Sequence, residues 1–149
     1  MFKHLIGKRS NLVKNTVERG AVKKFAEAIY DADPIYYDEE VGAMSRYKRN
    51  IAPPTFPITL DFGAIPELVL PEKGLIHGEQ KFHYKRPLLV GEDVYGLTEI
   101  KDYYEKNGSF GNMGFLVIHR YGFDAANELI FSEERVIIIN EAVRKEMPI

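Results

Sequence analysis

Side chains that could transfer protons are concentrated between Asp31 and Tyr36. Asp31 and Asp33 are carboxylates, which act as general acids or bases when they are held against a reacting group. Tyr36 carries a phenol, and because its unperturbed pKa is about 10, tyrosine is a poor base near neutral pH. The plainer interpretation of Asp31 is a turn aspartate whose carboxylate bonds nearby backbone, a common use of this residue.

Basic side chains form a second group that could bind phosphate, because guanidinium and ammonium groups make charge-assisted hydrogen bonds to phosphate oxygens. The group comprises Arg46, Lys48, Arg49, Lys85 and Arg86. A basic loop is as often simply solvated, so the residue types leave both interpretations open.

The four histidines do not have the spacing of a metal site. His77 and His83 lie six residues apart on an expected strand and therefore share a face, but no third ligand accompanies them. His119 stands on an apolar strand face and is expected to be a hydrogen-bonded core residue. Cysteine is absent, which excludes a thiolate nucleophile, a disulfide framework and cysteine-ligated zinc. The sequence also lacks GxSxG, HExxH and a glycine-rich phosphate loop, and we expect neither a metal nor a cofactor.

The composition predicts one domain, residues 1–149, because 149 residues with 45% hydrophobic content are typical of a single buried core. Twenty Lys and Arg against 22 Asp and Glu give a net charge of -2, which offers no attraction for a nucleic acid. No apolar run approaches the ~18 residues of a membrane helix, and residues 1–15 lack the apolar stretch of a signal peptide. With no cysteine, these features predict a cytoplasmic protein.

Helical spacing characterises the first half of the chain. Val22, Phe25, Ala26 and Ile29 fall at i, i+3, i+4 and i+7, so they share one face of a helix expected to begin near residues 15–18 and to end near Asp31. Asp38 is a candidate N-cap for a short second helix through Ser45, with two glutamates in its first turn, where the helix dipole favours negative charge.

An apolar, proline-rich stretch follows at residues 52–70. Proline fits the first turn of a helix because its missing N–H would be unpaired there, so we expect a short buried helix from about Pro54 to Gly63. Its apolar members are Phe56, Ile58, Leu60 and Phe62, which packing alone would select.

Alternation with period two begins at Leu75 and predicts four strands. Their expected ranges are 75–84, 94–104, 110–121 and 129–139, with a hairpin turn at Asn107-Gly108. The third strand carries bulky apolar groups on both faces and should be central in the sheet. The order predicts an α+β fold in which an antiparallel sheet wraps a central helix. One such sheet leaves an edge and apolar surface open, so we expect a dimer.

Two stretches resemble the MaoC-like hot-dog dehydratases, a family that includes R-specific enoyl-thioester hydratases and 3-hydroxyacyl dehydratases. Residues 30–36 read YDADPIY, where the family signature is roughly Gly-Asp-x-Asn-Pro-Ile/Leu-His. Residues 74–96 read GLIHGEQKFHYKRPLLVGEDVYG, which is similar to the strand and turn of the N-terminal-type domain of these enzymes. With the APPTF at residues 52–56, the resemblance covers essentially the whole chain and implies the hot-dog fold.

The signature has two departures that bear on catalysis. Adding water to an acyl thioester, or removing it, needs an acid/base pair and donors for the enolate-like oxygen. Asp31 matches the catalytic aspartate of the family, but Tyr36 stands where the histidine would be. The family's His-Gly at the start of the central helix is Pro53-Pro54 here, and proline has no N–H to offer an oxyanion. Losing one oxyanion donor alone can cost about 10²-fold in rate.

The resemblance therefore implies the substrate-binding half of a two-part dehydratase, which binds an acyl-CoA or acyl-carrier-protein thioester and requires a catalytic MaoC-like partner. Asp31 and Tyr36 would be the remnant of the catalytic dyad. The residues expected to bind substrate are Asp33, Arg46, Lys48, Arg49, Phe56, Leu60 and His77. Two alternatives stay open: a self-sufficient homodimeric hydratase that uses Asp31 with Tyr36 or His77, and a non-catalytic thioester-binding protein. The same sequence fixes neither the acyl length nor the choice between homodimer and heterodimer.

Overall fold

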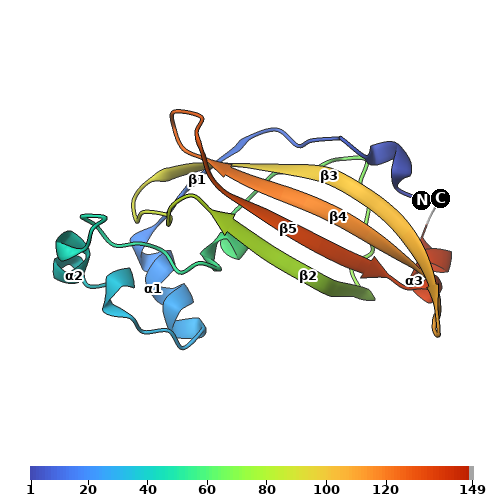
Figure 1. Cartoon of the computed structure of the whole chain (residues 1–149), viewed down its shortest axis with the longest axis horizontal. Helices are drawn as coiled ribbons and strands as arrows, with labels where there is room; N and C mark the ends of the chain where they lie inside the picture. Colours follow the sequence, from blue (N-terminus) through green and yellow to red (C-terminus); the bar gives the residue numbers. More distant parts are fainter. Residues whose placement is uncertain (148–149) are drawn as a thin grey trace.

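The computed structural model describes residues 1–147, which form one antiparallel sheet with short helices at its ends (Figure 1). The strand order is β1-β3-β4-β5-β2. The strands are β1 (Val13–Thr16), β2 (Leu75–Tyr84), β3 (Asp93–Gly108), β4 (Gly111–Phe123) and β5 (Leu129–Ile139). The α-helices are α1 (Arg19–Ala28), α2 (Glu39–Met44) and α3 (Glu141–Glu146). Three 3-10 turns complete the elements: η1 (Lys3–Leu5), η2 (Pro34–Tyr36) and η3 (Phe56–Thr59).

The predicted strands are confirmed, and β4 is the middle strand as expected. β2 and β5 have the predicted bounds, whereas β3 extends further towards the hairpin, to Gly108, and β4 extends further at its other end, to Phe123. The predicted turn at Asn107-Gly108 is wrong by two residues, because Gly108 pairs with Gly111 and the turn is Ser109-Phe110. Gly111 accepts this position because its φ of +93° is open to glycine and strained for other residues.

The first predicted helix forms as α1 but ends at Ala28, earlier than expected. Tyr30 adopts φ +56°, and the N–H groups of Tyr30 and Asp31 donate to the carbonyls of Glu27 and Ala26. This is the Schellman arrangement, which usually places glycine where Tyr30 stands. The second helix forms as predicted, and the Asp38 carboxylate accepts hydrogen bonds from the N–H groups of Glu40 and Val41.

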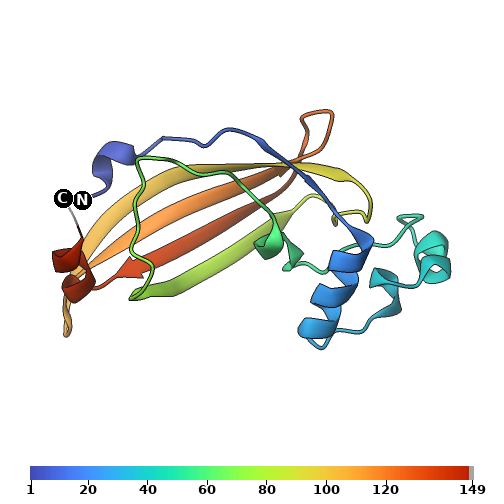
Figure 2. The ribbon, with the colours of Figure 1, turned by 180° about the vertical axis from the view of Figure 1, so that it is seen from behind.

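The helix predicted from Pro54 to Gly63 is wrong: only η3 forms there. Pro57 lies inside the predicted span and has no N–H to donate, and the backbone is already extended at Leu60. Residues 60–74 contain no helix or strand and cross one face of the sheet (Figure 2). The α+β class with an antiparallel sheet stands, but this chain does not supply a long central helix in its described residues.

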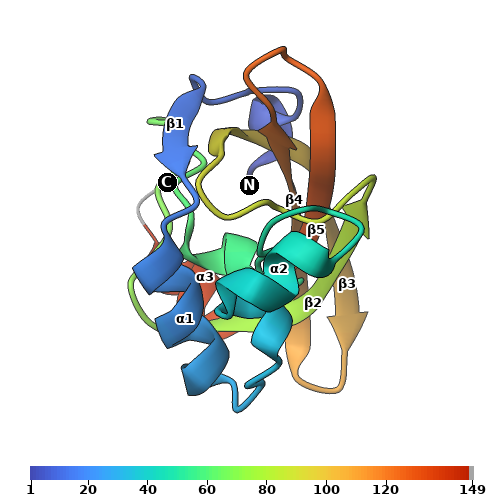
Figure 3. The ribbon, with the colours of Figure 1, turned by 90° about the vertical axis from the view of Figure 1, so that its left-hand side faces the viewer.

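We call the sheet face that residues 60–74 cross the inner face. Two clusters of buried side chains lie on it, one towards α1 around Phe56, Phe62 and Phe131, the other towards α3 around Leu116 and Ile139. The segment containing α1, η2 and α2 packs at one end of the sheet (Figure 3). The opposite, outer face has no element across it among residues 1–147 (Figure 1).

Candidate functional site

A pocket of about 340 Å³ lies where the helical segment meets the end of β2. Its lining combines apolar residues and prolines with two tyrosines and three basic side chains. The lining residues are Tyr36, Arg46, Ile51, Ala52, Pro54, Tyr84, Lys85, Arg86 and Pro87. The structure thus brings predicted Tyr36 and Arg46 together with Lys85 and Arg86, although they are far apart in the sequence.

Tyr36 reaches the pocket from η2, whose start is fixed by Asp33. The Asp33 carboxylate accepts a hydrogen bond from the Ile35 N–H at 3.0 Å and caps the turn. This local role accounts for Asp33 without any ligand. Tyr36 is 8% exposed and packs in the core cluster that also contains Phe56.

Asn50 holds this turn against the rest of the molecule and was missed in the sequence. Its side-chain amide donates to the carbonyls of Ile35 at 2.8 Å and Asp38 at 2.7 Å. Its oxygen accepts from Arg19 Nη1 at 2.8 Å, and its own carbonyl accepts from the Val90 N–H. Asn50 is 1% exposed, so one buried side chain joins η2, α2 and α1 beside the pocket.

The phenol of Tyr36 is a donor rather than a base. Burial raises the pKa of Tyr36, and the negative charges of Asp31 and Asp33 raise it further. Asp31 and Asp33 are both exposed and do not line the pocket. A phenol whose pKa is above 10 stays protonated at neutral pH, so it can donate a hydrogen bond but cannot accept a substrate proton.

Tyr84 forms the opposite wall and was not predicted. Its hydroxyl donates to the Pro54 carbonyl at 2.6 Å, and burial followed by the charge of Glu133 raises its pKa. Tyr84 therefore closes the pocket by joining β2 to the proline segment. Its position at the end of an alternating strand is a signal that could have indicated burial, whereas nothing around Asn50 indicates its role.

The basic side chains at the pocket differ in their availability. Arg86 makes two hydrogen bonds of 2.8 Å to the Glu92 carboxylate and is committed to it. Arg46 lies over the Tyr47 ring, 4.9 Å from its centroid, and makes no ion pair within residues 1–147; neither does Lys85. Arg46 and Lys85 are thus the two cations at this pocket without an acidic partner in the described chain.

The remaining predicted residues lie elsewhere. Arg49 donates to the Val90 carbonyl at 3.1 Å, Lys48 is exposed in the loop, and neither lines the pocket. Phe56 is 2% exposed in the core, and Leu60 packs against the same cluster. His77 lies seven residues before Tyr84 on β2, so it is roughly 23 Å away along the strand. The predicted set therefore divides between one pocket, the core, exposed positions outside the pocket lining, and a distant part of the sheet.

The backbone beside the pocket offers few donors. Pro53 and Pro54 have no N–H, the Ala52 N–H donates to the Leu88 carbonyl, and the Phe56 N–H donates to the Pro53 carbonyl. The pocket lining contains no histidine. Both observations agree with the two departures from the family signature.

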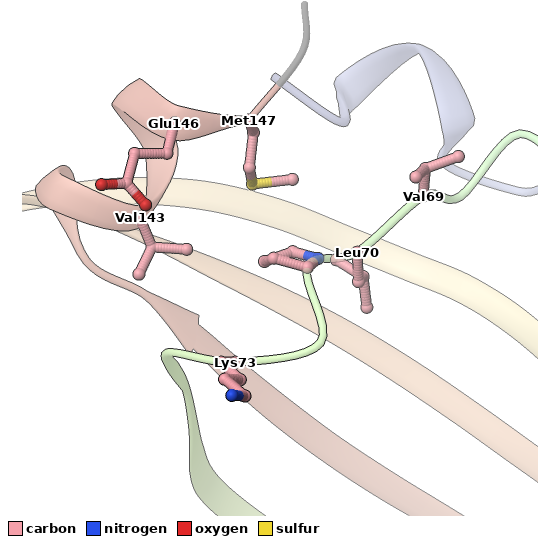
Figure 4. A pocket seen from close by; sticks show the side chains of 7 residues that line it. Val69, Leu70, Lys73, Val143, Glu146 and Met147 are labelled. Atoms are coloured by element: carbon pink, nitrogen blue, oxygen red, sulfur yellow. The ribbon is translucent and has the colours of Figure 1, made fainter.

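A second hollow, of about 180 Å³, lies at the far end of the sheet between residues 69–73 and α3 (Figure 4). Val143 and Met147 face Val69 and Leu70 there, and the charged side chains are Lys73 and Glu146. None of the predicted site residues lines it. Across residues 1–147, no group of three or more His, Asp or Glu side chains could hold a metal ion.

Residues 4–133 match the model of a family described as "FAS1-like, dehydratase domain region". The chain belongs to this family. Related sequences of this FAS1-like dehydratase domain include a "UPF0336 protein" of Thermobifida fusca, 41% identical over 92 residues, and one of Streptomyces avermitilis, 39% identical over 91. The aligned parts cover 58% and 57% of this chain and 60% and 61% of those relatives.

Solved structures show that the FAS1-like dehydratase domain has the MaoC-like hot-dog fold. The truncated HadBC (3R-hydroxyacyl-ACP dehydratase) complex of Mycobacterium tuberculosis superposes with a TM-score of 0.75 at 21% identity, over 93% of this chain and 99% of that one. The (R)-hydratase from A. caviae superposes with a TM-score of 0.68 at 22% identity, over 90% of this chain and 96% of that one. The ChsH1-ChsH2 complex of Mycobacterium tuberculosis superposes with a TM-score of 0.74 at 21% identity, over 89% of this chain and 84% of that one. No helix among residues 1–147 is both long and apolar enough to cross a membrane.

Proposed function

We propose that this chain is the acyl-thioester-binding subunit of an R-specific 3-hydroxyacyl dehydratase or enoyl hydratase, and that it needs a catalytic MaoC-like partner. The single observation that carries the proposal is the composition of the 340 Å³ pocket: a protonated phenol, two cations without an acidic partner among residues 1–147, apolar walls and no histidine in the lining. Such a pocket can hold an acyl carrier and its phosphate but has no group suited to move a proton at neutral pH.

The cations support binding of a phosphorylated carrier. Arg46 and Lys85 have no acidic partner in the described chain, and both kinds of side chain bind phosphate through charge-assisted hydrogen bonds. Coenzyme A and the phosphopantetheine arm of a carrier protein share this phosphate chemistry. Tyr36 would donate to a carbonyl or amide of the arm from the pocket wall.

The need for a partner follows from the same site. Asp31 is exposed and Tyr36 is protonated, so the pair lacks the imidazole that would take the proton. Two of the structurally similar proteins are described as complexes, HadBC and ChsH1-ChsH2, which makes a two-subunit assembly a reasonable expectation. We place the activity in fatty acid metabolism in the cytoplasm, which also remains a prediction.

Crotonyl-CoA tests the proposal directly. We expect the purified chain to bind crotonyl-CoA without loss of the enoyl absorbance, and turnover to appear only when a MaoC-like subunit with an intact Asp and His is added. Turnover by the chain alone that disappears in Asp31→Ala would establish the self-sufficient hydratase instead. Binding without turnover under every partner condition would favour a thioester-binding protein without chemistry.

The Lys85→Ala variant tests the pocket itself. Removing one charge-assisted contact should weaken crotonyl-CoA binding about tenfold. Binding of crotonyl-pantetheine, which carries no phosphate, should stay unchanged. Lys24→Ala is the matched control, because Lys24 is an exposed lysine on α1 outside the pocket lining. Equal effects of the two substitutions, measured by calorimetry, would show that the phosphate does not bind at this pocket.

A further inference from the structure

Three segments that are far apart in the sequence enclose a hollow at the α3 end of the sheet. It has a volume of about 490 Å³, and we call it the end hollow. Its apolar lining residues are Met1, Phe2, Val69 and Met147, and its polar ones are His4, Glu67 and Arg144. The volume falls within the range of about 300 to 1,000 Å³ that ligand pockets occupy. None of the residues predicted for the acyl-thioester site lines it.

The end hollow is separate from the pocket at Tyr84. α3 follows β5, whose last residue, Ile139, pairs with Leu75 at the opposite end of β2 from Tyr84. Leu75 and Tyr84 are nine residues apart on the strand, which corresponds to about 30 Å. A small ligand in one site therefore does not touch the other.

The end hollow has a packed wall and an open rim. Phe2 is buried, and its ring packs edge-on against Tyr103 with the centroids 5.6 Å apart. Lys8 donates to the Glu67 carboxylate at 2.8 Å, which joins the N-terminal segment to residues 60–74. Val69, by contrast, is 64% exposed. An apolar ligand can therefore enter past Val69 and lie on a wall that is already formed.

Met147 allows this wall to adapt to an apolar chain. Its side chain points from α3 towards the segment that contains Val69 and Leu70 (Figure 4). Met147 lines both the end hollow and the smaller hollow of about 180 Å³, so it separates the two. Methionine is unbranched and fills irregular gaps in several conformations. A chain longer than the end hollow could thus continue beneath α3.

Arg144 supplies unused hydrogen-bond donors at the end hollow. A guanidinium has five N–H donors. Arg144 Nη2 lies 3.2 Å from Glu105 Oε1, whereas Nε and Nη1 are buried without a hydrogen-bond partner in residues 1–147. Unpaired donors on a buried charged group are costly, so a ligand that pairs them is favoured. Arg144 also lines a neighbouring hollow of about 240 Å³, so its guanidinium lies beside space into which it can turn.

Glu105 balances the charge of Arg144 but does not use up its donors. Glu105 Oε1 also accepts from the Tyr103 hydroxyl at 3.0 Å, and Oε2 accepts from Asn112 Nδ2 at 3.2 Å. These hydrogen bonds, from Asn112 and from Tyr103, lower the pKa of Glu105, so the carboxylate stays ionised at neutral pH. A ligand with one negative charge can use the spare N–H groups, whereas a dianion would bring more charge than this pair can balance.

We propose that the end hollow binds a linear apolar carboxylic acid. Its chain would lie on Phe2 and Met147, and its carboxylate would pair with the spare N–H groups of Arg144. The planar guanidinium matches the geometry of a carboxylate. The apolar walls favour a hydrocarbon chain over a polar ligand. This acid is a ligand additional to the thioester, and the inference does not depend on the proposed function.

Decanoate is the probe that tests the inference. Changes in backbone amide shifts on titration, measured by NMR, should appear at Phe2, Val69 and Met147 and not at Tyr36 or Tyr84. Decyltrimethylammonium, which has a chain of the same length and a positive head group, should bind about tenfold more weakly or less. No decanoate binding at about 1 mM, or shift changes confined to Tyr36 and Tyr84, would overturn the inference.

Substitutions separate the donors of Arg144 from its ion pair. Arg144→Met should weaken decanoate binding about tenfold, since it removes a charge-assisted contact. Glu105→Gln is the matched control, because it breaks the same ion pair but keeps the donors, and binding should stay unchanged or tighten. Equal weakening by both would show that Arg144 acts only through Glu105 and would overturn the inference.

A second pair of variants alters only exposed positions, so it does not put folding at risk. Val69→Asp places a negative charge at the open rim and should weaken decanoate binding, whereas Val41→Asp, at an exposed valine of α2, should not. Saturating decanoate should also leave the affinity for crotonyl-CoA unchanged. Competition between the two ligands would place decanoate in the pocket at Tyr84 and refute a separate site, whatever the outcome for the proposed function.

Discussion

Replacing Asn50 with alanine should both destabilise the protein and loosen the pocket wall. The substitution removes two hydrogen bonds to the carbonyls of Ile35 and Asp38 and one from the Arg19 guanidinium. A neutral hydrogen bond contributes about 1 kcal/mol and one to a charged group about 1.5 to 3 kcal/mol. Their sum predicts a loss of about 3.5 to 5 kcal/mol in the free energy of unfolding.

In Asn50→Ala the carbonyls of Ile35 and Asp38 each keep one hydrogen bond, so the loss in the free energy of unfolding is not larger. The Asp38 carbonyl still accepts from the Gly42 N–H at 2.9 Å, and the Ile35 carbonyl from the Ile51 N–H at 3.4 Å. Gly42 also shows how closely this region is packed, since a Cβ there would lie 2.6 Å from the Asn50 backbone nitrogen. The alanine variant therefore leaves a gap that neighbouring backbone cannot easily close.

Urea unfolding followed by circular dichroism measures the loss. With a slope of about 2 kcal/mol/M, the urea midpoint should fall by roughly 1.7 to 2.5 M. Asn107→Ala is the control, because Asn107 is exposed near the end of β3, and its substitution should change stability by less than about 0.5 kcal/mol. A loss below about 1 kcal/mol in Asn50→Ala would refute the idea that this side chain holds η2 in place.

Two further predictions concern stability and its dependence on pH. Tyr30→Gly should raise the melting temperature in calorimetry, since glycine adopts φ +56° without the cost of about 1 kcal/mol that an L side chain incurs; an unchanged or lower value would contradict this. Burial acts to raise the pKa of Glu99, but hydrogen bonds from Arg9 and Tyr121 outweigh it and lower the pKa. The contribution of Glu99 to the free energy of unfolding is therefore present above its unfolded pKa near 4.5 and is lost as the pH falls through its lower folded pKa. The Glu99→Gln variant should therefore lose less stability than the unchanged chain as the pH is lowered, as measured by urea unfolding at a series of pH values.

The sheet could be predicted from the sequence because alternation is a local signal. In β2 and β5 the alternation of residue types along the chain indicates which sheet face each side chain occupies, and both strands have the predicted bounds. The stretch from Pro54 to Gly63 could not be predicted as well, because its apolar composition suits a buried helix and a buried irregular segment equally. Pro57 decides between them by removing a backbone donor inside the span.

The candidate site was only partly predictable for a different reason. Tyr36 and Arg46 were found through motif and charge, and the fold brings Lys85 to them. Asn50 acts through hydrogen bonds to backbone carbonyls, which any sequence position provides, so its type alone carries no signal. His77 belongs to a recognisable stretch, but its position depends on strand length, which places it away from the pocket.

The irregularity in β2 has a consequence for aggregation of the chain. Register shifts between His77 and Glu79, and Gly78 lies where a Cβ would be 2.7 Å from Ile138, so the exposed strand is kinked there. Charged Glu79 and Lys81 follow immediately. Bulges and charges of this kind hinder pairing with unrelated strands, so the edge of β2, which is unpaired among the described residues, is protected against fibrillar aggregation.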